Sequence, residues 1–228
     1  MPEPERTRAI RSYVLRAGRM TAAQERALTQ HWALYGVDFQ PALLDLARLY
    51  GREAPRTLEI GFGNGEQLLQ RAVAQPERDF LGVEVHLPGV GHLLLAAAKA
   101  GVANVRLICH DAIEVLQRQI PPDSLDEVQL LFPDPWPKKR HHKRRIVQPG
   151  FATLVASRLR AGGSVHLATD WEPYAQQMLL VLSGCESLAN TAADGGYSRA
   201  VIARQATRFE RRGQRLGHRV HELLFRRR

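Results

Sequence analysis

Residues 59–66 read Glu-Ile-Gly-Phe-Gly-Asn-Gly-Glu and close a short apolar run. The glycines Gly61, Gly63 and Gly65 let the backbone turn tightly and approach a ligand where a side chain would collide. A dinucleotide-binding loop would need its third glycine at position 66, where Glu66 would repel a pyrophosphate at a helix N-terminus. The stretch also lacks the Gly-Lys-Ser/Thr ending of a phosphate-binding loop. It therefore predicts either a structural turn or a binding loop for a ligand without phosphate.

Acidic residues lie at or just after the ends of four predicted strands: Glu59, Glu84, Asp111 and Asp134. In an open parallel sheet the carboxyl ends of the strands face one crevice, so these carboxylates are expected to converge. Acids around a glycine loop suit a cofactor with positive charge and no phosphate, and S-adenosylmethionine carries a sulfonium and an ammonium group. Glu84 would accept hydrogen bonds from ribose hydroxyls, and Asp111 from an adenine amino group. Alternatively, Glu84 is a solvated strand end and Asp111 caps a helix over 111–119.

Residues 132–145, FPDPWPKKRHHKRR, combine a stiff acidic segment with the densest positive charge of the chain. Prolines on both sides of Asp134 fix its backbone, so its carboxylate is held at a defined angle. Such a carboxylate can accept a hydrogen bond from a ligand's donor group or ammonium, and can stabilise positive charge that develops nearby. Trp136 offers a face on which a base can stack, or else it is a core aromatic residue.

The formal net charge is +9, and the cations cluster at residues 138–145, 204–215 and 226–228. Clustered guanidinium groups favour a polyanionic partner, whereas scattered ones would indicate only a solvated surface. One loop would then supply both an acidic pocket and a cationic surface for a polyanion. His141 and His142 are expected to be neutral surface groups or phosphate contacts. We expect no metal site, because further ligands at a suitable spacing are missing.

The elements that must position these residues alternate between short apolar runs and helical stretches. The apolar runs are 57–61, 79–85, 104–109, 125–132 and 163–169, and the helical stretches are 65–75, 89–101, 111–119, 150–160 and 171–183. This alternation predicts an α/β fold, a mostly parallel sheet with helices on both faces. Residues 218–225 are expected to add an antiparallel edge strand. Two further helices are predicted before the sheet, over 21–32 from the capping-box spacing of Thr21 and Gln24, and from Pro41 to about Tyr50.

Neither an internal repeat nor a low-complexity linker is evident, so we expect residues 1–50 to form a helical extension of one domain over 51–228. No run approaches the roughly 20 apolar residues of a membrane span, and the charged N-terminus does not resemble a signal peptide. Cys109 and Cys185 stand in apolar surroundings and are expected to be reduced thiols rather than a disulfide. These features predict a cytoplasmic protein.

Several stretches carry a resemblance to a known family: EIGFGNGE (59–66), GVEVHLPGVG (82–91), CHDAIEVL (109–116), FPDPWPKKRHHKRRIVQ (132–148), HLATDWEPYA (166–175) and TRFERRGQRLGH (207–218). The chain resembles the tRNA (guanine-N7-)-methyltransferases of the bacterial single-subunit type over nearly its whole length. The resemblance implies a seven-stranded, Rossmann-like class I methyltransferase fold with S-adenosylmethionine as methyl donor. It also implies methylation of N7 of a guanine in the variable loop of tRNA, at position 46.

The resemblance assigns roles to individual residues. Glu59, Glu84, Asp111 and Asp134 would contact the methyl donor together with Gly61, Gly63 and Gly65, and Asp134 would also be the catalytic residue. Lys138, Asp170, Thr207, Arg208, Phe209 and Glu210 would contact the substrate, and Arg140, His141, His142, Lys143, Arg144 and Arg145 the RNA. Arg208 stands where the family has lysine, and residues 190–204 match poorly. Alternatively, Asp170 caps the helix over 171–183, and 207–210 belong to an amphipathic surface helix.

The expected chemistry needs no general base, because N7 of guanine has an in-plane lone pair and no proton. The enzyme must instead orient two reactants, which can lower a barrier by about 7–11 kcal/mol. Two other functions remain open: methylation of an exocyclic amine, which uses an Asp/Asn-Pro-Pro-aromatic order, and RNA binding without catalysis. We expect a monomer or homodimer without an obligatory protein partner. The arginine-rich N-terminus is expected to fold against RNA or donor.

Overall fold

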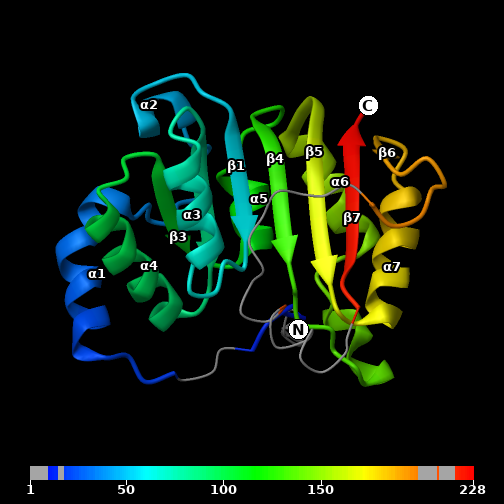
Figure 1. Cartoon of the computed structure of the whole chain (residues 1–228), viewed down its shortest axis with the longest axis horizontal. Coiled ribbons are helices and arrows are strands. Elements are labelled where there is room, and N and C mark those ends of the chain that lie inside the picture. The colour runs from blue at the N-terminus through cyan, green and yellow to red at the C-terminus, as the bar shows by residue number, and fades with distance from the viewer. Residues whose placement is uncertain (1–9, 15–17, 200–209, 211–218) are drawn as a thin grey trace, which may run out of the picture.

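The structure is a computed structural model, which describes residues 10–14, 18–199, 210 and 219–228. Its centre is a seven-stranded sheet in the order β3-β2-β1-β4-β5-β7-β6 (Figure 1). The strands are β1 (Arg56–Ile60), β2 (Asp79–Glu84), β3 (Val105–Cys109), β4 (Leu125–Leu131), β5 (Leu159–Thr169), β6 (Leu188–Asn190) and β7 (His221–Arg227). Strands β1 to β5 pair in parallel, and β7 runs antiparallel to both β5 and β6. The predicted α/β fold is confirmed, and the last strand is antiparallel as expected, but it lies between β5 and β6 and the edge position is taken by β6.

The order of the strands reverses between β1 and β4, because β1 pairs with β2 on one side and with β4 on the other. The glycine loop follows β1, and the segment with Asp134 follows β4. In open α/β sheets, ligands bind outside the carboxyl ends of the strands at such a switch point. The topology therefore brings the two most informative sequence motifs to one crevice.

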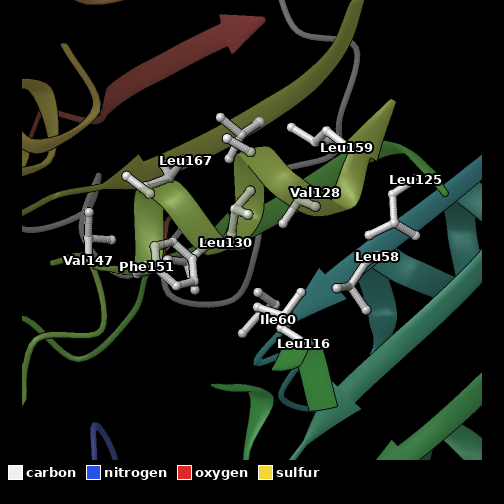
Figure 2. Packing of buried hydrophobic residues seen from close by; sticks show 14 of the residues in the cluster. Leu58, Ile60, Leu116, Leu125, Val128, Leu130, Val147, Phe151, Leu159 and Leu167 are labelled. Carbon is white, nitrogen blue, oxygen red and sulfur yellow. The ribbon is translucent and has the colours of Figure 1, made fainter. Parts of the chain in front are cut away.

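Helices cover both faces of the sheet. They are α1 (Ala22–Tyr35), α2 (Leu46–Tyr50), α3 (Glu66–Ala74), α4 (Leu87–Ala100), α5 (Ala112–Arg118), α6 (Pro149–Arg158) and α7 (Glu172–Ser183), with a 3-10 helix η1 (Lys139–Arg144). Alternate residues of the central strands point into a core beneath α5 and α6, where Leu58, Val128 and Leu167 meet Leu116 and Phe151 (Figure 2). On the other face, Phe80 and Leu107 pack under α3 and α4. Both faces of β1 and β2 are thus covered, so their apolar residues are buried on either side of the sheet and polar ones such as Glu59 are buried with them.

The helix α1 lies against α4 (Figure 1). The Nε2 of Gln24 donates to the carbonyl oxygen of Pro88 at 3.1 Å. The hydroxyl of Tyr35 donates to the carbonyl oxygen of Ala97 at 3.3 Å. A Cβ at Gly91 would lie 3.0 Å from the carbonyl oxygen of Gln24, so the two helices meet at a position that favours glycine. The predicted capping box of Thr21 and Gln24 is present and begins this helix.

The structure departs from the predicted elements in a few places, and β5 begins at Leu159, four residues before the predicted run 163–169. The helix expected from Pro41 begins only at Leu46, because the Oδ1 of Asp45 accepts from the amide of Arg48 at 2.9 Å and caps it there. Residues 36–44 instead form an irregular segment, which is held at one end by the amide of Val37 donating to the carbonyl oxygen of Leu107 in β3 and at the other by the amide of Leu44 donating to that of Gln119, both at 2.8 Å. The three-residue strand β6 was not predicted. Among the helices of the described residues, none is long and apolar enough to cross a membrane.

Candidate active site

The glycine loop after β1 turns through three left-handed residues, with φ of 71° at Gly61, 59° at Gly63 and 75° at Gly65. No described atom lies within 4 Å of the position that a Cβ would take at Gly61 or Gly63, so this part of the loop faces open space. A Cβ at Gly89 in α4 would lie only 2.1 Å from the carbonyl oxygen of Gly63. The loop is therefore fixed from one side by α4 and open to a ligand on the other.

Glu84 holds this loop through its carboxylate. Its Oε2 accepts from the amide of Gly63 at 2.8 Å, and its Oε1 accepts from the amides of Val85 at 2.7 Å and His86 at 3.0 Å. The side chain thus ties the glycine loop to the residues that begin α4, and it is not the solvated strand end that the sequence left open. A ribose contact of Glu84 stays a prediction, and it would use the remaining acceptor capacity of the carboxylate.

Glu59 is a buried acid, 4% exposed, in the middle of the sheet between Gly82 and Gln129. Burial raises the pKa of Glu59 to about 7; Arg71 opposes this rise, while Glu127 and Glu84 add to it. Its Oε2 has no hydrogen-bond partner among the described residues. An unpartnered buried carboxylate oxygen costs free energy unless a cation or donor reaches it. Together with the open glycine loop, it fits a ligand that brings an ammonium group and no phosphate.

Asp111 follows β3 and caps α5, because its Oδ1 accepts from the amide of Ile113 at 2.9 Å. The capping alternative is therefore present, and it leaves Oδ2 for the predicted adenine contact. Partial burial first, and Asp111 second, raise the pKa of Tyr13, so the described N-terminal residues lie at this crevice. Tyr13 was not among the predicted site residues, because only the charge of the neighbouring arginines distinguished the N-terminus in the sequence.

The segment after β4 has a strained and firmly held backbone. Phe132 and Trp136 have φ of 51° and 45°, the left-handed region that bulky residues rarely adopt. The amide of Phe132 donates to the carbonyl oxygen of Ala168 at 2.8 Å, which anchors the segment to β5. Between them, Asp134 is exposed to solvent. Backbone strain of this kind is typical of functional sites, where the surrounding structure holds the conformation.

Trp136 is half-buried and surrounded by polar partners. The guanidinium of Arg144 lies over its ring at 5.1 Å, His141 meets the ring edge-on at 5.8 Å, and its Nε1 donates to the carbonyl oxygen of Ser12 at 3.1 Å. One face of the indole is therefore occupied by Arg144, so Trp136 joins the acidic segment, the basic run and the N-terminal residues. A stacked base would need the opposite face or a displaced arginine.

The basic run forms η1, and most of its charge is on the surface. Lys138, Lys139, Arg140 and Lys143 are exposed, while His141, His142 and Arg144 are partly covered. The pKa of His141 is lowered, first by burial and then by the cations around it. This keeps the imidazole neutral near pH 7, as the sequence suggested. In the described part of the chain, no cluster of three or more histidine, cysteine or acidic side chains has an arrangement for a metal ion.

Arg145 differs from the rest of the run, because it is 3% exposed. Its Nε donates to the carbonyl oxygen of Pro135 at 2.8 Å, its Nη1 donates to Oε1 of Gln177 at 2.6 Å, and its guanidinium lies over the Tyr174 ring at 4.7 Å. A guanidinium held inside the protein does not face a phosphate. We therefore treat Arg145 as a brace between the Asp134 segment and α7, in place of the RNA contact expected from the sequence.

Asp170 lies directly after β5, at the same edge of the sheet as Asp134. The helix α7 has Trp171 as its N-cap without a side-chain cap bond, so Asp170 does not cap it. Glu210, also among the predicted substrate contacts, is 9% exposed. Both residues have interaction partners in the structure. The predicted contacts Thr207, Arg208 and Phe209 lie outside the described residues.

A glycine loop after β1, acids at the ends of the next strands, and a reversal of strand order between β1 and β4 define a class I methyltransferase fold. Solved structures agree at the level of the fold. The antibiotic-resistance methyltransferase Kmr has a TM-score of 0.56 at 15% identity, covering 84% of this chain and 96% of that one. The 16S rRNA (adenine(1408)-N(1))-methyltransferase from Catenulisporales acidiphilia, solved with cosubstrate SAM, has a TM-score of 0.53 at 18% identity, covering 84% and 92%.

Sequence comparisons give the family. A family model described as a putative methyltransferase matches residues 53–223. A protein of Klebsiella pneumoniae subsp. pneumoniae is 55% identical over 96% of this chain and 92% of its own length, and one of Aeromonas hydrophila subsp. hydrophila is 54% identical over 96% and 93%. Both are named tRNA (guanine-N(7)-)-methyltransferase. The chain belongs to the tRNA (guanine-N7-)-methyltransferase family, which confirms the resemblance seen in its motifs.

Proposed function

We propose that this chain transfers the methyl group of S-adenosylmethionine to N7 of guanine 46 in the variable loop of tRNA. The observation that carries the proposal is the loop after β4, in which Asp134 stands at the switch-point crevice and the exposed cations of η1 follow directly. A base and its attached phosphates need these two environments side by side. The names of the 54–55% identical relatives support the same reaction.

Within this proposal, S-adenosylmethionine would supply an electrophilic methyl group to the crevice. The buried carboxylate of Glu59 would take the ammonium group, since its Oε2 has no partner among the described residues. The open side of the glycine loop at Gly61 and Gly63 leaves room for the donor to lie close to the backbone of the protein. Glu84 and Asp111, at the ends of β2 and β3, would hold the ribose and the adenine.

For the transfer, the lone pair of N7 forms a bond to the methyl carbon while the sulfur–carbon bond breaks, and no proton leaves the base. Positive charge moves from sulfur to the purine. The carboxylate of Asp134, fixed between two prolines and braced by Arg145, would orient the base and stabilise that charge. The residues therefore work by orientation and preorganised electrostatics, and not by deprotonating a nucleophile.

We propose tRNA as the partner, with Lys138, Arg140, His142, Lys143 and Arg144 facing its phosphates around the loop, and His141 as a neutral contact. Asp170 and residues 207–210 would complete the pocket for the base. The purified chain is proposed to act without an obligatory protein partner, as a monomer or homodimer, in the cytoplasm. Activity of the purified chain alone tests the absence of an obligatory partner, and its mass from light scattering tests the oligomeric state.

The test is methyl transfer from labelled S-adenosylmethionine to an unmodified tRNA transcript, followed by nucleoside mass spectrometry. We expect 7-methylguanosine as the product, and no label on a matched transcript in which guanine 46 is replaced by adenine. Label on an exocyclic amine would keep the fold and donor but refute the base pocket. Tight donor binding without any transfer would favour an RNA-binding module.

A further inference from the structure

A cavity of about 220 Å³ lies at the edge of the sheet, between the loop that follows β6 and the first residues of β7. We name it the edge cavity; its walls include Asp194, Tyr197, Ser198, Arg199, Arg219 and His221. Pockets for whole small-molecule ligands measure about 300–1,000 Å³, so this cavity suits a group the size of a single ring system. Neither the glycine loop nor the Asp134 segment contributes to it.

The edge cavity adjoins the proposed base pocket. His221 pairs with Thr169 in the antiparallel ladder of β5 and β7, and Asp170 is the next residue after Thr169. The amide of Ser198 donates to the carbonyl oxygen of Glu222 at 2.8 Å, which ties the loop after β6 to the start of β7. Because β7 is antiparallel, it begins where β4 and β5 end (Figure 1). The cavity therefore lies at the same end of the sheet as Asp134 and Asp170.

The walls of the edge cavity combine aromatic rings with cations. The rings of Tyr197 and His221 are 4.7 Å apart at 57°. Arg199 and Arg219 are exposed, and Arg199 pairs with Asp194 at 2.8 Å, with both side chains largely in solvent. Exposed ion pairs contribute little, so a phosphate can replace the carboxylate at Arg199. Stacking platforms beside cations are the means by which proteins bind single-stranded nucleic acids.

Both rings are neutral near pH 7, which suits stacking. Burial, and then Glu172, raise the pKa of Tyr197. Burial lowers the pKa of His221; Glu172 opposes this and Arg219 adds to it. The positive charge at the cavity thus comes from Arg199 and Arg219, which lie beside two uncharged rings, while Asp194 and Glu222 are the acidic side chains of its lining. This separation matches a nucleotide, whose base is apolar on its faces and whose phosphate is anionic.

We propose that the edge cavity binds the base of a nucleotide adjacent to the target guanine, against Tyr197 and His221, with Arg199 and Arg219 on the neighbouring phosphates. The inference rests on the proposed function and extends it to recognition of a flanking nucleotide. Because this base does not react, its binding contributes equally before and during methyl transfer. Loss of the contact should therefore raise KM for tRNA and leave kcat unchanged.

The first test uses Tyr197→Ala and Tyr197→Phe. We expect the alanine variant to raise KM for tRNA about tenfold, the range of one lost stacking contact, with kcat and donor affinity within twofold of wild type. The phenylalanine variant keeps the ring and should retain the wild-type KM. An unchanged KM in Tyr197→Ala would overturn the proposal, and so would a loss in which kcat falls and KM does not.

A second measurement does not depend on turnover. A transcript with 2-aminopurine next to position 46, placed 5′ in one sample and 3′ in another, should lose fluorescence on binding wild-type protein in one of the two. Tyr197→Ala should abolish this quenching. If wild type makes no 7-methylguanosine but quenching occurs and depends on Tyr197, the proposed function fails and the edge cavity stands. Quenching that is absent from both transcripts, or insensitive to Tyr197→Ala, refutes the cavity alone.

The arginines provide variants with little risk to folding, since both are exposed. Arg199→Ala and Arg219→Ala should each weaken tRNA binding severalfold and lower its salt dependence by roughly one phosphate contact. Arg118→Ala, on the exposed end of α5, is the matched control and should have no effect. Equal salt dependence in all three variants would contradict the phosphate contacts.

Discussion

At the scale of single residues, Glu59 best distinguishes a binding site from a merely stable fold. A carboxylate that is 4% exposed, with one oxygen unpartnered among the described residues, destabilises the folded protein when it is ionised. Such a residue makes sense if a cationic ligand completes it. Burial raises its pKa to about 7, above the ordinary 4.5, so its proton is lost in the physiological range.

The pH dependence of stability follows from this shift. The pKa of Glu59 is higher in the folded protein than in the unfolded chain, so its protonated form stabilises the fold. This stabilisation is fully present below pH 4.5 and is lost as the pH rises through about 7. Above pH 7 the free energy of unfolding is lower by on the order of 3 kcal/mol. Glu59→Gln should therefore stabilise the ligand-free protein more at pH 8 than at pH 5, measured by thermal unfolding. A larger gain at pH 5 would contradict the shifted pKa.

Donor affinity should show the opposite preference. If the ionised Glu59 binds the donor's ammonium group, affinity for S-adenosylmethionine weakens as pH falls below about 7, by up to tenfold per pH unit. In Glu59→Gln, affinity should be lower and nearly independent of pH between 5.5 and 8. Isothermal titration at three pH values checks this, and wild-type affinity that stays constant across that range would exclude Glu59 from the ammonium contact.

At the scale of elements, the loop after β4 depends on its attachment to α7. Arg145 spans from Pro135 to Gln177, and the Nε2 of Gln177 donates in turn to the carbonyl oxygen of Val147 at 3.1 Å. The strained residues Phe132 and Trp136 flank the catalytic candidate Asp134. A loop held in this way presents its carboxylate in one orientation, which a reaction that relies on positioning requires.

Arg145→Lys tests this brace. Lysine cannot reproduce two divergent hydrogen bonds and a ring contact, so we expect a loss of about 1.5–3 kcal/mol, or roughly 3–10 °C in Tm, and a lower kcat. Arg140→Lys, which retains an exposed charge, is the control and should behave as wild type. If Arg145→Lys kept its Tm and instead reduced the salt dependence of tRNA binding, the guanidinium would be an RNA contact after all.

The strands of the sheet could be predicted from the alternation of apolar runs and helical stretches. The acidic residues near the site could be predicted because they stand at the ends of those runs. The runs that became β1 to β4 were located within one or two residues, and Asp111 appeared in the capping role that had been left open. Tertiary contacts decided what periodicity could not. A run of eight consecutive polar residues gives no sign that Arg145 alone is buried. The left-handed backbone at Phe132 and Trp136 runs against the preference of both residue types, so only the surrounding fold could reveal it.

At the scale of the whole molecule, the candidate site residues and the densest positive charge lie at the carboxyl ends of the parallel strands. The glycine loop, Asp134, Asp170 and η1 all follow the ends of parallel strands, and β7 brings the edge cavity to the same side. With a net charge of +9, the molecule is attracted to polyanions in general, and the exposed cations of η1 concentrate that attraction near the pocket.

The salt dependence of binding should localise to that run. Replacing Lys138, Lys139 and Arg140 with alanine should lower the slope of log affinity against log salt concentration by about 2–3, since each phosphate contact contributes roughly 0.7–0.9. Lys99→Ala, an exposed cation in the last turn of α4, is the control. Equal slopes for wild type and the triple variant, measured by filter binding, would place the RNA elsewhere.

The account depends most directly on Asp134. The decisive measurement is single-turnover methyl transfer by wild type and Asp134→Ala to unmodified tRNA at saturating donor, with the product identified by mass spectrometry. We predict 7-methylguanosine from wild type and a rate at least about 100-fold lower in the variant, because preorganised electrostatic groups contribute on that scale. Transfer by Asp134→Ala within a fewfold of wild type would contradict the proposed pocket.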